Sequence, residues 1–65
     1  MIIQLWQIRQ RKKLTLKQLA EISGISKSEI NDIENGKVSP RFETLEALAA
    51  ALNCKIGNFV KSDYL

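Results

Sequence analysis

The sequence predicts an all-α fold, a compact bundle of five short helices that contains a helix-turn-helix. Two observations predict it: the spacing of small and β-branched residues within residues 16–35, and repeated helix-start signals. Two helices that cross at about 90–120° need a small side chain at the crossing, a glycine in the turn and a β-branched wedge. Ala20, Gly24 and Ile30 meet these demands in order. The apolar seam expected to join the two helices consists of Leu19, Ala20, Ile25, Ile30 and Ile33.

The first three helices follow from apolar spacing and from two capping pairs. A first helix is expected over about residues 3–12, because Leu5 and Ile8 recur at helical spacing. Thr15 with Gln18, and Ser26 with Glu29, each form a capping-box pair in front of an apolar run. Two such pairs so close together predict two short consecutive helices, which begin at residues 15 and 26.

The rest of the chain is predicted to add a loop and two helices. The third helix ends near Gly36, which can take the left-handed conformation, and Ser39 is biased away from helix because it precedes Pro40. A fourth helix follows, and its apolar face carries Phe42, Leu45, Leu48, Ala49 and Leu52. A fifth helix is expected over about residues 56–61, and no strand is expected.

Composition limits the function. The 65 residues fit one domain, and ten Lys and Arg against seven Asp and Glu favour a polyanionic partner. Cys54 is the only cysteine and there is no histidine, which excludes an intramolecular disulfide, a Cys-His metal site and a Cys-His nucleophile. We therefore expect neither an enzyme nor a cofactor. The apolar start, residues 1–3, is too short for a signal peptide or a membrane span, so a cytoplasmic protein is expected.

Four stretches of the chain read IRQRKKLTLKQLAE, SGISKSEINDIENGK, SPRFETLEALAAALN and KIGNFV. Together, in this order and at these separations, they resemble the Cro/C1-type (Xre-like) helix-turn-helix family of bacterial and phage transcriptional regulators. The resemblance implies a lambda-repressor-like domain over residues 1–65 whose third helix, about Lys27 to Glu34, reads the major groove. It also implies a sequence-specific regulator, with repression the expected role, that binds a palindromic operator on double-stranded DNA as a homodimer.

The resemblance assigns roles residue by residue. The positions that face base edges, where each side-chain type can bond a base, are Lys27, Ser28, Asn31 and Asp32. The positions that hold phosphates are Lys17, Ser26, Asn35, Lys37 and Arg41. The alternative for these residues is a solvated surface without a ligand.

The resemblance also implies a partly buried salt bridge between Arg9 and Glu34. Lys13 stands where the family often has glycine, and Leu16 where it commonly has a glutamine that reaches a phosphate. Acidic residues on the third helix would be repelled by phosphates unless they accept from a cytosine amine. This leaves a second function open: a protein-interaction module on the same fold, antitoxin-like or antagonist, with weak or no DNA binding.

The end of the chain predicts the dimer contact. Ile56 and Phe59 are enough to hold the last helix to the core. Apolar side chains that find no internal place mark an interaction surface. The expected dimer interface therefore consists of Val60, Tyr64 and Leu65.

Overall fold

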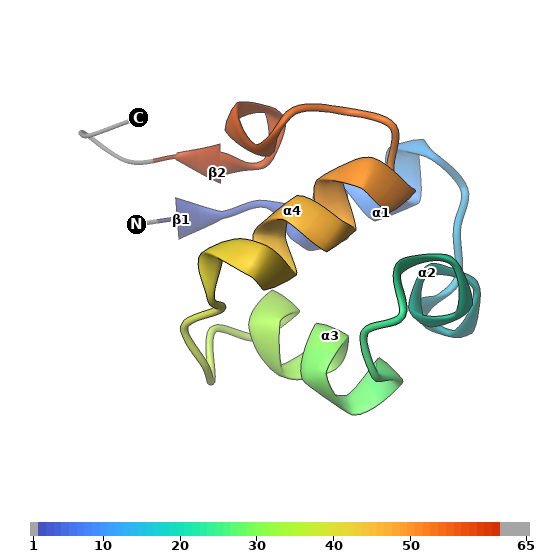
Figure 1. Cartoon of the computed structure of the whole chain (residues 1–65), viewed down its shortest axis with the longest axis horizontal. Coiled ribbons are helices and arrows are strands. Elements are labelled where there is room, and N and C mark those ends of the chain that lie inside the picture. The colour runs from blue at the N-terminus through green and yellow to red at the C-terminus, as the bar shows by residue number, and fades with distance from the viewer. Residues whose placement is uncertain (1, 62–65) are drawn as a thin grey trace.

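The computed structural model describes residues 2–61, which form four α-helices, one 3-10 turn and two short strands (Figure 1). In chain order these are β1 (Ile2–Ile3), α1 (Leu5–Arg11), α2 (Leu16–Ser23), α3 (Lys27–Glu34), α4 (Phe42–Ala51), η1 (Ile56–Asn58) and β2 (Val60–Lys61). The fold is thus mostly helical, as predicted. No helix within residues 2–61 has the length and apolar character that crossing a membrane requires.

The predictions of a fifth α-helix and of no strand are wrong. The segment expected to form that helix makes a single 3-10 turn and then pairs, antiparallel, with the start of the chain: Ile2 lies opposite Lys61 and Ile3 opposite Val60. The Gln4 N–H continues this pairing by donating to the carbonyl of Phe59 at 2.6 Å. Because Ile2–Ile3 is extended, α1 begins two residues later than expected.

The core lies between the four helices and the strand pair. Its buried side chains are Leu5, Ile8, Leu19, Ile30, Ile33, Leu45, Leu48, Ala49, Leu52, Phe59 and Val60. Ala20 and Ile25 of the predicted seam are half-buried and pack against this cluster. Phe42 does not: it is 61% exposed, so the apolar face of α4 begins at Leu45.

Val60 corrects the expected dimer interface. In a strand successive side chains point to opposite faces, and in β2 this turns Val60 inward and Lys61 outward. Val60 is only 2% exposed, so the expectation that it finds no internal place is wrong. Phe59 is buried and Ile56 half-buried, as expected. Tyr64 and Leu65 lie outside the described residues.

The helix starts follow the capping pairs. The Gln18 N–H donates to Thr15 Oγ1 at 3.0 Å, and the Thr15 N–H donates to Gln18 Oε1 at 2.8 Å, so this capping box is complete. At α3 only one half of the predicted box is formed: the Glu29 N–H donates to Ser26 Oγ at 3.1 Å. Both side chains satisfy backbone N–H groups that have no partner within the helix.

Three helices end in the same double hydrogen bond, and Lys13 stands at one of these ends. At α1 the Lys13 N–H donates to the carbonyl of Gln10 and the Leu14 N–H to that of Arg9, the pattern of a Schellman motif. The residue at the turn is left-handed in each case: Lys13 (φ 58), Gly36 (φ 72) and Asn53 (φ 53). Glycine takes this conformation without strain, whereas lysine does not.

Candidate nucleic-acid interface

The turn between α2 and α3 has the geometry that the sequence predicts. Gly24 is left-handed (φ 76), and its N–H donates to the carbonyl of Ala20 at 2.9 Å. The Ile25 N–H donates to Ser23 Oγ at 3.1 Å, and Ser26 then caps α3. Figure 1 shows α2 nearly end-on while α3 lies in the plane of the view, so the two helices cross steeply. This is a helix-turn-helix.

The outward face of α3 carries the four residues predicted to face base edges. Ile30 and Ile33 point into the core, and they are 0% and 2% exposed. At about 100° per residue, positions 27, 28, 31 and 32 fall on one arc opposite them. Lys27, Ser28 and Asn31 are exposed, and Asp32 is half-buried. The structure therefore brings the four side chains together on one face.

Two adjoining grooves lie where α2 and α3 begin. One is lined by Leu16, Lys27, Ser28 and Asn31. The other is lined by Arg9, Gln10, Lys13, Leu14, Thr15, Leu16, Lys17 and Lys27. None of these eight lining residues is acidic. Leu16 and Lys27 line both grooves. The lysines make this part of the surface suitable for an anion.

The five predicted phosphate residues lie at the two ends of α3 and beside it. Lys17 is in the first turn of α2 and Ser26 is the N-cap of α3. Asn35 is the C-cap of α3, Lys37 lies in the following loop, and Arg41 is the N-cap of α4. All five are exposed. The structure thus places polar and basic groups on both sides of the outward face of α3.

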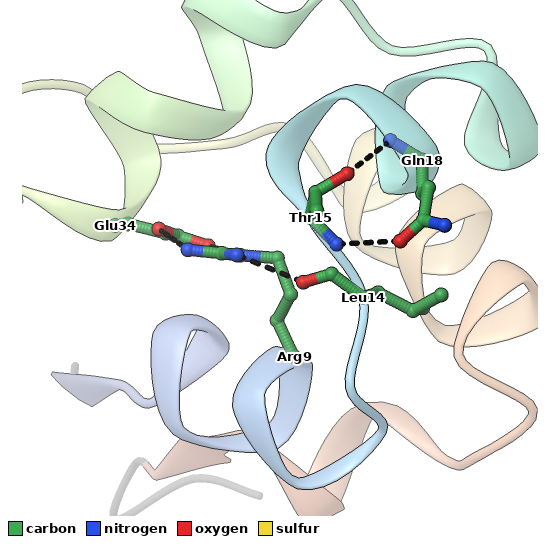
Figure 2. A network of polar contacts seen from close by, with 5 residues as sticks. All are labelled: Arg9, Leu14, Thr15, Gln18 and Glu34. Atoms are coloured by element: carbon green, nitrogen blue, oxygen red, sulfur yellow. Dashed lines mark hydrogen bonds and ion pairs between the residues drawn. The ribbon is translucent and has the colours of Figure 1, made fainter.

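Arg9 and Glu34 form the expected ion pair (Figure 2). Arg9 Nε donates to Glu34 Oε2 at 2.7 Å and Nη2 donates to Oε1 at 3.0 Å, while Nη1 donates to the Leu14 carbonyl at 2.9 Å. The side chains are 8% and 5% exposed. The hydrogen bond to Glu34 raises the pKa of the Arg9 guanidinium, against the opposing effect of burial. The pair joins α1, the segment before α2, and the end of α3.

Leu16 is the surface residue that the sequence reasoning missed. The comparison with the family's usual glutamine suggested only that a phosphate contact is lost at this position. In the structure Leu16 is the first residue of α2 and lies beside the first turn of α3 in both grooves. The signal that could have found it is an apolar side chain at a helix start that faces another helix start across a tight turn.

The chain is similar to known helix-turn-helix proteins. A family model described as "Helix-turn-helix" matches residues 7–59. The chain is 41% identical over 58 residues to the immunity repressor protein of Bacillus phage phi105. These residues make up 89% of this chain and 40% of the phage protein. It is 42% identical over 64 residues to the HTH-type transcriptional repressor RghR of Bacillus subtilis, covering 95% of this chain and 47% of that protein.

A third relative is the HTH-type transcriptional regulator SutR of Escherichia coli, 38% identical over 54 residues, which cover 83% of this chain and 30% of SutR. The chain therefore spans less than half the length of each of these three relatives. Their names describe regulators and repressors, in agreement with the prediction that the chain is not an enzyme. Since the matching segment includes both α2 and α3 and most of the described residues, the chain belongs to the helix-turn-helix family, of the Cro/C1 type.

Proposed function

We propose that this protein is a sequence-specific DNA-binding transcriptional regulator that acts as a repressor. The observation that carries the proposal is the outward face of α3, where Lys27, Ser28, Asn31 and Asp32 stand together with exposed polar and basic residues at both ends of the helix. The names of the relatives, two of which are repressors, support the same function. Residues 1–65 would then form one DNA-binding domain.

The size of α3 supports a major-groove contact. An α-helix with its side chains is about 10–12 Å across, which fits the roughly 12 Å width of the major groove, and the eight residues of α3 supply about two turns for it. Base edges would meet the outward face of α3, and the two phosphate backbones would meet the groups at its ends, from Lys17 and Ser26 to Lys37 and Arg41. Ser26 Oγ accepts from the Glu29 N–H and keeps its own proton to donate to a phosphate.

We further propose that the protein binds a palindromic operator as a homodimer. The proposal is supported by the resemblance to dimeric family members and by the apolar Tyr64 and Leu65 in the sequence. Isologous dimers present two identical reading helices related by a two-fold axis, so a palindromic site matches them. We also propose a cytoplasmic location, because the relatives are proteins of bacteria and of a bacterial phage, whose DNA lies in that compartment.

Selection from random duplexes followed by binding at several salt concentrations tests the function. We expect an enriched sequence and a slope of log K against log salt of about −2.7 per protomer, because Lys17, Lys37 and Arg41 would each neutralise one phosphate. Lys55→Ala is the control, because Lys55 is an exposed lysine that precedes η1 and is not one of the three expected to meet a phosphate. This variant should keep the same salt slope. No enriched sequence together with a flat salt dependence would overturn the proposal in favour of a protein-interaction module.

A further inference from the structure

The groove lined by Leu16, Lys27, Ser28 and Asn31 combines one apolar wall with three hydrogen-bonding side chains. Leu16 supplies the apolar wall. It is half-buried and packs against the core, so its position is held while part of its surface stays open. Lys27 offers a donor, and Ser28 and Asn31 can each donate and accept.

Among the four bases, thymine has the edge that fits such a groove. In the major groove thymine presents a C5-methyl group beside the O4 acceptor. Cytosine has no methyl group and presents an amino donor, which would face the ammonium donor of Lys27. An apolar wall next to a donor therefore distinguishes thymine from cytosine by two separate contacts.

We propose that Leu16 is a specificity-determining residue that contacts the C5-methyl of a thymine, while Lys27 donates to O4 of the same base. This inference rests on the proposed function. In helix-turn-helix complexes the N-terminal residues of the second helix reach base edges while the first helix crosses the backbone. Leu16 and Lys27, the first residues of α2 and α3, meet in the groove where these two contacts adjoin.

The test replaces each thymine of the selected operator in turn by deoxyuridine, which removes only the methyl group. For the unmodified protein we expect one position in each half-site at which this change weakens binding about fourfold, the effect of one buried methyl group. In Leu16→Ala the thymine-to-deoxyuridine ratio at that position falls to about 1. The ratio compares two DNAs with one protein, so a loss of stability in the variant does not affect it.

Ile22→Ala is the matched control, because Ile22 is an exposed apolar residue of the same helix that lines neither groove. It should keep the fourfold ratio. Leu16→Gln is a second variant, with good helix propensity, and its ratio should also be about 1. If the unmodified protein prefers its operator but no deoxyuridine effect depends on Leu16, the inference is overturned while the proposed function stands. Absence of any sequence preference would overturn the proposed function instead.

Discussion

The guanidinium of Arg9 donates two hydrogen bonds to the carboxylate of Glu34 and a third to the carbonyl of Leu14. One side chain of α1 thereby holds the end of α3 and the segment that leads into α2 (Figure 2). Arg9 therefore connects the segment before α2 to the end of α3, so a residue that touches no base in our proposal supports the geometry of the surface.

Arg9→Ala should lower the free energy of unfolding by about 3 kcal/mol, because Glu34 would keep a nearly buried carboxylate without its partner. In a domain of this size the melting temperature should fall by about 12 °C or more. Arg11→Ala is the control, since Arg11 is exposed on the same helix, and it should change stability by less than about 0.5 kcal/mol. Equal melting temperatures for the two variants would contradict the role of the pair.

Lys13→Gly should stabilise the domain by about 1 kcal/mol, because glycine takes the left-handed conformation at φ 58 without the strain that lysine carries. Chemical denaturation measures the gain. Lys12→Gly is the neighbouring control: Lys12 is right-handed (φ −84), so glycine there should destabilise the fold. A gain from both substitutions, or from neither, would show that backbone strain at Lys13 is not the cause.

Replacing residues on α3 and beside it should separate specificity from affinity. Lys27→Ala or Ser28→Ala should reduce the preference for the selected operator over single-base variants, since base contacts specify. Lys37→Ala or Arg41→Ala should weaken binding to every sequence alike and reduce the salt slope by about 0.9. Titrations with the operator and its variants at fixed salt measure both effects. The assignment of roles is wrong if the two pairs of variants behave in the same way.

Cys54 should react slowly with alkylating reagents. Burial raises the pKa of its thiol, and the positive charge of Lys12 lowers it by a smaller amount. The raised pKa means that less thiolate is present at a given pH. In a plot of alkylation rate against pH, the rate should therefore increase at higher pH for the folded protein than for the protein unfolded in urea. Lys12→Gln should slow the reaction further, whereas Lys17→Gln on α2 should leave the rate unchanged. A folded rate profile that coincides with the unfolded one would contradict this expectation.

The dimer can be tested on DNA. Footprinting should show two protected half-sites about 34–36 Å apart between centres, one turn of the duplex. Tyr64→Asp should weaken this paired protection, while Lys55→Asp, which also introduces a carboxylate near the end of the chain, should not. Protection of a single half-site that is unaffected by Tyr64→Asp is the result that argues against a dimer.

Sequence alone predicted the features that local chemistry determines. Thr15 and Ser26 cap helices where expected because a capping side chain reaches backbone groups only two or three residues away. The strand pair was missed because it joins Ile3 to Val60, which are separated by almost the whole chain. The residues next to either one do not indicate which segment it pairs with. The same pairing buries Val60, which therefore could not be recognised as a core residue.

The candidate site divides in the same way. The shared face of Lys27 and Asn31 follows from helical periodicity, so the sequence was sufficient to group them. The meeting of Leu16 with Lys27 depends on how steeply α2 and α3 cross and on how the turn at Gly24 orients them, which spacing along the chain does not specify. Roles at base edges and phosphates stay predictions that the variants above address.

The antiparallel pairing of β1 with β2 brings the first and last described residues side by side, on the part of the molecule away from α3 (Figure 1). A short linker should therefore suffice to join Lys61 to Ile2, so a circular permutant of residues 2–61 with new ends at the exposed loop around Val38 and Ser39 should retain the helix-turn-helix.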